Sequence, residues 1–177
     1  MNPQLFLDLA TQAIKNTLYG LMINGIKYKK IGNSTYKMTR FLSQEFTFYL
    51  NDLTHQVQNS DKTIYQDYIP LDSKAESEFP QDCESSEQVK FYFKLPNWFP
   101  IPTPIGTYNP DWALILEDEK EIYFVAETKD TGTYPIIDLR KLRIDEQLKI
   151  KCGYAHFREI APVKYAVVQK VSDLTNK

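Results

Sequence analysis

The chain has 177 residues, 42% hydrophobic and 25% charged, so it can bury one core and is not a disordered segment. Its net charge of −2, from 21 basic and 23 acidic residues, argues mildly against a nucleic-acid binder, because such domains are usually basic. A local basic rim is still possible at this net charge. If the domain binds DNA, we expect other parts of an assembly to supply much of the phosphate contact.

Two cysteines, Cys83 and Cys152, are too few for a disulfide framework or a four-cysteine zinc site. We expect both to be buried or idle thiols in a reducing compartment. The sequence has neither an apolar run of membrane-spanning length nor a visible secretory signal. We therefore expect a cytoplasmic protein without a membrane partner.

The first part of the chain, residues 1–70, is expected to form an N-terminal helical and hairpin extension. Apolar residues at helical spacing predict a helix over residues 3–19 that stops at Gly20. Gly32-Asn33 predicts a hairpin turn within residues 25–40, and residues 41–53 have the pattern of a short amphipathic helix. Residues 54–69 are polar and weakly patterned.

Residues 71–177 are expected to form an α/β core in the order helix, three strands, helix, strand. Ser73 and Glu76 have capping-box spacing and predict a helix over residues 73–79. Strands are predicted over residues 89–95, 111–117, 121–129 and 163–171. The Pro-rich passage 96–110 is predicted to be an ordered loop. A second helix is predicted over residues 138–152, with Asp138 as N-cap and Gly153 just beyond its end.

The chemistry-bearing residues stand at the ends of two neighbouring predicted strands. Asp111 opens one strand, and Glu127 and Lys129 close the next. A tight turn would pair these strands antiparallel, which brings Asp111 and Glu127 to the same sheet edge. Carboxylates are the ligands that Mg²⁺ prefers, and a lysine can position water or balance charge at phosphorus. An exposed ion pair between Glu127 and Lys129 is the simpler interpretation of that half of the motif.

The pattern resembles the PD-(D/E)xK nuclease superfamily. More narrowly, three stretches are similar to the C-terminal endonuclease domain of the restriction (Res) subunit of type III restriction–modification enzymes. They are "YFKLPNWFPIPTPIGTYNPDWALILED", "IYFVAETKDT" and "LRIDEQLKIKCGYAHF". The resemblance implies a restriction-endonuclease-like core, a mixed central β-sheet flanked by helices, over residues 71–177.

The resemblance also implies the site and its partners. Asp111, Glu127 and Lys129 would be catalytic, and Asp111, Glu127 and the Thr128 carbonyl would bind Mg²⁺, for which Mn²⁺ can substitute. The substrate would be double-stranded DNA, cut to 5′-phosphate and 3′-hydroxyl ends. The partners would be a helicase-like motor region of the same parent protein and a methyltransferase (Mod) subunit. The chain has no Gly-x-x-x-x-Gly-Lys-Ser/Thr loop, so ATP would act only through that motor, and we expect either a piece of a larger protein or a stand-alone relative.

Several further residues have two interpretations. Glu76 either completes the metal site or only caps its helix with Ser73. A set of polar residues at helical spacing either contacts DNA phosphates or forms a solvated face: Arg140, Arg143, Gln147 and Lys151. His156 is expected to be structural rather than a general base, and His55 has no supporting neighbours in the sequence. Trp112 is expected to anchor the core, as is Trp98, which could instead contact DNA.

Two other functions remain open from the sequence. The chain could be a non-catalytic docking module of the same assembly. It could also be a different nuclease of the superfamily that acts in DNA repair or transposition.

Overall fold

The computed structural model describes residues 2–29, 53–116, 122–128, 137–159 and 163–175, with backbone only for 75 and 122–127. Its helices are α1 (Pro3–Asn24), α3 (Glu78–Ser85), α4 (Ile144–Arg158) and α5 (Ser172–Thr175), with 3₁₀ turns η1 (Ser60–Lys62), η2 (Lys74–Glu76) and η3 (Leu139–Lys141). Its strands are β1 (Thr54–Gln56), β2 (Tyr68–Pro70), β3 (Val89–Lys94), β4 (Ile101–Thr103), β5 (Gly106–Tyr108), β6 (Trp112–Leu116), β7 (Ile122–Thr128) and β8 (Lys164–Val168).

A four-stranded mixed sheet in the order β3-β6-β7-β8 forms the centre of the molecule. β6 pairs antiparallel with both β3 and β7, and β7 pairs parallel with β8. The apolar run of β6 therefore occupies an interior position, where both faces of a strand are covered. The prediction of a mixed α/β fold is confirmed at this level, whereas the finer superfamily topology stays a prediction.

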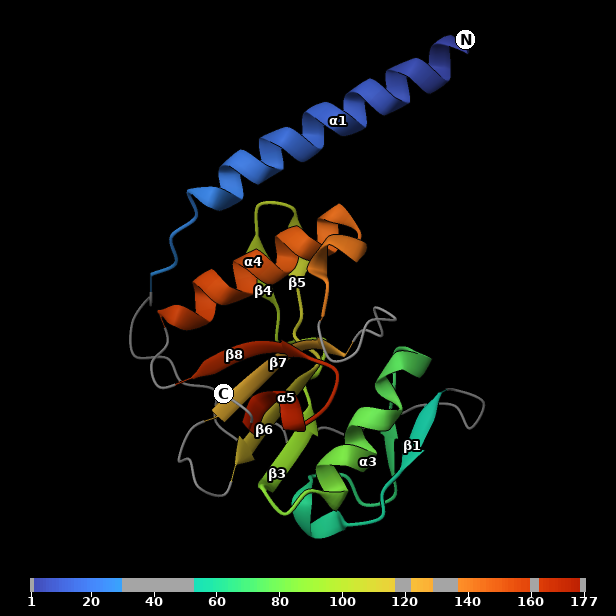
Figure 1. Cartoon of the computed structure of the whole chain (residues 1–177), viewed down its shortest axis with the longest axis vertical. Helices are drawn as coiled ribbons and strands as arrows, with labels where there is room; N and C mark the ends of the chain where they lie inside the picture. Colours follow the sequence, from blue (N-terminus) through green and yellow to red (C-terminus); the bar gives the residue numbers. More distant parts are fainter. Residues whose placement is uncertain (1, 30–52, 117–121, 129–136, 160–162, 176–177) are drawn as a thin grey trace.

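The sheet is covered on both faces, because alternate side chains of β8 pack into two different core clusters. Ala166 and Val168 pack in the large core cluster with Phe79 of α3 and Leu174 of α5. Tyr165 and Val167, the residues between, pack with Ile150 and Phe157 of α4. Helices α3 and α4 accordingly lie on opposite sides of the sheet, as Figure 1 shows.

The β1–β2 pair is joined to the core through the buried carboxylate of Glu84. Glu84 accepts a hydrogen bond of 2.8 Å from the Tyr92 hydroxyl and one of 3.1 Å from the backbone N–H of Gln58. His55 lies 3.4 Å from the same carboxylate, so it does have a neighbour that the sequence did not indicate. Ile69 is fully buried in the large core cluster. A boundary at residue 70 stays a prediction, but the residues just before it share this core.

The Pro-rich passage contains a short hairpin, so the prediction of a loop without regular structure was wrong. β4 and β5 pair antiparallel, with Pro102 opposite Thr107. Gly106 has φ 109°, a conformation that favours glycine, and the Thr103 hydroxyl donates to its carbonyl. The hairpin also buries Ile101 and Tyr108 against α4. Packing on a neighbouring helix stabilises paired strands that local propensity disfavours.

The helix ends differ from the predicted ones. α1 continues through Gly20 and is capped at Gly25. The predicted helix at 73–79 is instead η2 followed by α3. Asp138 caps η3 and not α4, which begins at Ile144 and continues past Gly153. The predicted hairpin within residues 25–40 and the predicted helix over residues 41–53 lie mostly outside the described residues. Only residues 25–29 of the first and residue 53 of the second are described.

Gly153 serves close packing rather than helix termination. A Cβ atom at this position would lie 2.5 Å from Cζ and 2.6 Å from the hydroxyl of Tyr165. That ring cannot move away easily, because it stacks on Phe157 and its hydroxyl bonds to the Tyr108 hydroxyl at 2.7 Å. A glycine near a predicted helix end can therefore mark a close packing contact as well as the end of the helix.

We predict that Gly153→Ala lowers the free energy of unfolding by about 1–3 kcal/mol, because the added methyl group overpacks the α4–β8 contact. The matched control is Gly20→Ala in α1, where a new Cβ would meet no side chain of the described residues within 4 Å. That change should raise helix stability by up to about 1 kcal/mol. Urea denaturation of both variants measures the difference, and equal behaviour of the two would contradict the packing argument.

Candidate metal centre

Three carboxylates meet beside the start of β6. Asp72, Glu76 and Asp111 each offer an oxygen, and these oxygens lie within 4.8 Å of one another. Glu76 is buried, Asp111 is half-buried and Asp72 is exposed. A set of hard oxygen donors at this spacing fits a divalent cation such as Mg²⁺.

Local structure brings these carboxylates together from two segments. Asp111 lies directly before β6, and its backbone carbonyl accepts a 2.8 Å hydrogen bond from the N–H of Leu95, at the end of β3. Glu76 ends η2, where its carboxylate accepts from the Asp72 N–H at 3.3 Å and the Ser73 hydroxyl at 3.1 Å. Ser73 thus donates to Glu76 and makes no side-chain cap of its own. The two interpretations of Glu76 are therefore compatible, because it orders its turn and also faces Asp111.

Lys94, the last residue of β3, places a buried cation against this cluster. Its ammonium group bonds to Asp72 at 2.8 Å and also to Glu76. It lies 5.6 Å from the ring centroid of Trp112, its register partner on β6. Burial alone would lower the pKa of Lys94, but the hydrogen bonds to Asp72 and Glu76 outweigh it and raise the pKa above its usual value. Lys94 is therefore a fixed positive charge that offsets part of the negative charge of the cluster.

Asp72 and Lys94 were not predicted from the sequence. Lys94 occupies one polar position of an alternating strand, yet it is 7% exposed because both faces of β3 are covered at that end. Asp72 has the sequence context of a loop residue before a helix. The sequence feature that could have indicated Lys94 is a lysine at the end of an otherwise apolar strand, directly before the Pro-rich passage.

The structure places the other predicted site residues only in part. β6 and β7 pair antiparallel with Trp112 opposite Val125, so the start of β6 does lie beside the end of β7, where Glu127 sits. A register shift relative to β8 falls between Val125 and Thr128. The side chain of Thr128 is buried, and its hydroxyl has no hydrogen-bond partner among the described residues. The Glu127 side chain and all of Lys129 fall outside the described parts, so their roles stay predictions.

The predicted basic helix face is not formed as expected. Arg140 belongs to η3 and pairs with Asp138 at 2.8 Å, whereas Arg143 is the N-cap residue of α4 and pairs with Glu146 at 3.3 Å. Gln147 donates to the Leu142 carbonyl at 2.8 Å. The four residues do not share one helix because the segment from Asp138 to Arg143 is a separate turn. Lys151 is exposed on α4.

The remaining candidates have structural surroundings. Trp112 is fully buried against Phe79 and Tyr92, and Trp98 packs partly buried on the same cluster. His156 makes edge contacts with Tyr28 and Phe157, and burial lowers its pKa. Both cysteines are free and buried, as predicted.

A mixed α/β fold with a carboxylate cluster beside a central strand defines a candidate metal-dependent enzyme domain. Comparison with protein families matches residues 61–171 to the family described as the endonuclease domain, and the chain belongs to this family. Membership supports a nuclease that acts on DNA. Comparisons with curated proteins and with solved structures gave no match. Within the described ranges, no helix has the length and hydropathy of a membrane span.

We predict that Lys94→Met destabilises the metal-free protein by about 3 kcal/mol, because it leaves Glu76 buried without its cation. The matched control is Lys90→Met, an exposed lysine on the same strand, which should change stability by less than about 0.5 kcal/mol. Chemical denaturation in the presence of a chelator measures both values. A small loss of stability in Lys94→Met would show that its ion pairs contribute little.

Proposed function

We propose that this chain is a Mg²⁺-dependent DNA endonuclease domain of the PD-(D/E)xK type. Asp111, Glu127 and Lys129 are its catalytic residues in this proposal, and Glu76 adds a further carboxylate. The observation that carries the proposal is the meeting of Asp111 with Glu76 and Asp72 at the strand end where the motif begins.

The donor chemistry supports a resident divalent cation. Asp111, Glu76 and Asp72 would hold it, together with Glu127 and the Thr128 carbonyl of the neighbouring strand. When bound, Mg²⁺ would polarise the phosphate and lower the pKa of the attacking water. In this reaction the water would lose a proton to solvent as its oxygen bonds to phosphorus, and the P–O3′ bond would break. The leaving O3′ would take up a proton from solvent, which gives a 5′-phosphate and a 3′-hydroxyl end.

The chain's own residues would supply positioning and charge. Lys94 holds Glu76 and Asp72 through its ion pairs, so these side chains are oriented before a substrate arrives. Lys129 would balance charge at the phosphorus or position the water. Burial of Glu76 strengthens every electrostatic interaction that its carboxylate makes.

The more specific proposal is the endonuclease domain of a type III Res subunit. It rests on the Pro-rich passage and the Asp111, Glu127 and Lys129 spacing, which resemble that family. In this proposal the motor region and the Mod methyltransferase select the cleavage site. Alone, the chain would cut DNA weakly and without sequence preference.

We predict that Asp111→Asn weakens Mn²⁺ binding by at least about tenfold in calorimetric titration, since loss of even an outer supporting group costs roughly 10–100-fold. It should also abolish the residual nicking of supercoiled plasmid by the chain. Asp61→Asn, an exposed change in η1, is the control and should leave both measurements unchanged. Unaltered Mn²⁺ affinity in Asp111→Asn would remove this residue from the site.

A second experiment tests the type III assignment. The chain is fused to its motor region, combined with the methyltransferase, and supplied with ATP and Mg²⁺. We predict double-strand breaks only in plasmids that carry unmethylated recognition sites, and none with Lys129→Met. Equal cutting of plasmids without such sites would instead favour a repair or transposition nuclease.

A further inference from the structure

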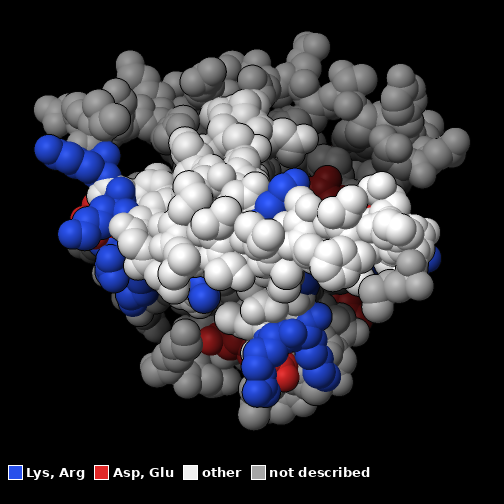
Figure 2. Space-filling view, turned by 90° about the horizontal axis from the view of Figure 1, so that it is seen from above, with Lys and Arg blue, Asp and Glu red and all other residues white. Residues whose placement is uncertain are grey.

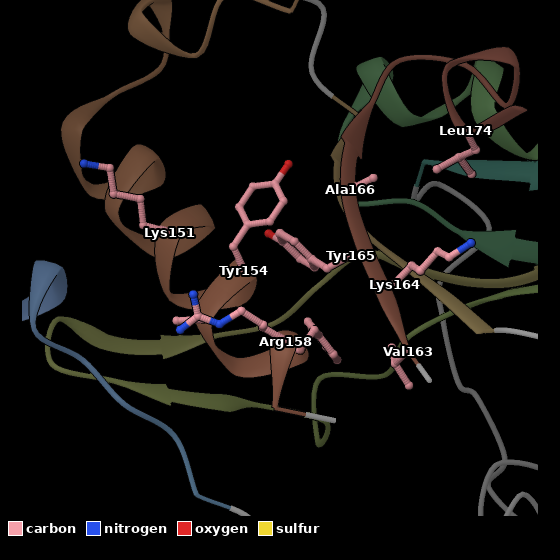
Figure 3. Close-up of a pocket in the computed structure, with 10 residues that line it drawn as sticks. Lys151, Tyr154, Arg158, Val163, Lys164, Tyr165, Ala166 and Leu174 are labelled. Carbon is pink, nitrogen blue, oxygen red and sulfur yellow. The ribbon is translucent and has the colours of Figure 1, made fainter. Parts of the chain in front are cut away.

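A groove between α4 and β8 lies apart from the carboxylate cluster. Its volume is about 710 Å³, and residues of α4, β8 and α5 line it. None of Asp72, Glu76 and Asp111 lines it, and no acidic residue is among the described residues that do. Figure 3 shows the aromatic and basic members of this lining.

Aromatic rings from α4 and β8 line this groove. Tyr154 and Tyr165 meet edge to face with centroids 4.7 Å apart, and Tyr165 stacks on Phe157 at 5.3 Å with an interplanar angle of 14°. Packing therefore fixes the orientation of Tyr165. Tyr154 is 45% exposed, so part of its ring is open to a ligand.

Two basic side chains of α4 stand on the rim beside Tyr154. Lys151 and Arg158 come from α4, one on each side of Tyr154 in sequence, and Figure 3 shows both extending to the same side. Lys164 of β8 extends to the opposite side, away from both tyrosine rings, because it alternates with Tyr165 and shares the sheet face of Ala166. Arg158 also contacts Glu159 at 3.8 Å, but this pair is largely exposed and contributes little.

The wider surface does not continue this basic character uniformly. Viewed from the α1 side, the centre of the molecule is mostly uncharged, and Lys and Arg side chains gather in separate groups around it (Figure 2). In α1 the charged residues are Asp8 and Lys15. The groove therefore combines positive charge with an accessible ring. This combination favours a ligand that carries both negative charge and a flat ring over one that carries negative charge alone.

We propose that this groove binds an unpaired segment of a DNA strand, with a base against Tyr154 and backbone phosphates near Lys151 and Arg158. Aromatic rings beside basic side chains are the general means by which proteins hold single-stranded nucleic acid. A duplex offers its phosphates to such a groove but keeps its base faces stacked, and an acidic peptide need not present a flat ring. The proposal goes beyond cleavage, because it needs neither the metal nor the carboxylates.

The test measures binding of a fluorescent oligothymidylate of about 12 nucleotides by anisotropy, in a chelator, with the complete chain. Tyr154→Leu should weaken binding by at least about fivefold, the lower range expected when one base can no longer stack. Tyr154→Phe should bind like the unmodified chain, because it keeps the ring. Lys151→Gln combined with Arg158→Gln should lower the slope of log Kd against log salt by about 0.7 for each phosphate that these side chains neutralise.

Exposed residues elsewhere provide matched controls. Tyr68→Leu on β2 and Lys90→Gln on β3 should leave the affinity unchanged. Thermal melts of each variant show whether it is folded. Unchanged oligothymidylate affinity in folded Tyr154→Leu overturns the proposal, as does an equal weakening of binding to a blunt duplex of the same length. Asp111→Asn should bind the oligothymidylate as the unmodified chain does. An error in the proposed metal site and an error in the proposed groove would therefore give different results.

Discussion

The buried ammonium group of Lys94 joins the elements on which the candidate metal centre depends. Lys94 ends β3, contacts Trp112 on β6, and bonds to carboxylates that η2 and the loop before it provide. A lysine in this position is costly to bury unless carboxylates accompany it, and Glu76 is equally costly without a cation. The lysine and the two carboxylates therefore stabilise one another. Their ion pairs hold the segment that precedes α3 against the central sheet, beside Asp111.

Much of the sheet follows from the sequence, because its strands are apolar runs of ordinary strand length. The β6–β7 pairing that places Asp111 beside the end of β7 also follows from the short connection between these strands. Lys94 and Asp72 could not be found in this way, since their importance comes from contacts between segments distant in sequence. The β4–β5 hairpin was missed for the same reason: its prolines disfavour strands locally, whereas packing of Ile101 and Tyr108 on α4 stabilises them.

Helix α4 positions the basic and aromatic groove and also supports the hairpin that precedes Asp111. One face buries Ile150 and Phe157 between the sheet and the β4–β5 hairpin, and Gly153 permits close approach of Tyr165. The arginines that precede the helix lie in a separate turn and pair with nearby acidic residues, and their contact with phosphates stays a prediction. The C-terminal half of α4 instead brings Lys151 and Arg158 to a groove that Tyr165 of β8 also lines. The residue spacing within the helix does not reveal this contact with β8.

The carboxylates of the cluster differ sharply in their access to water. The side chain of Asp72 is 71% exposed and that of Glu76 is 6% exposed, although both bond to one ammonium group. An incoming hydrated ion would meet the outer carboxylate first and would have to shed water before it reached the inner one. Asp72 would then govern how fast an ion enters, and Glu76 would govern how long it stays. The arrival of an ion and the time it stays bound would thereby depend on different residues within a single turn of the chain.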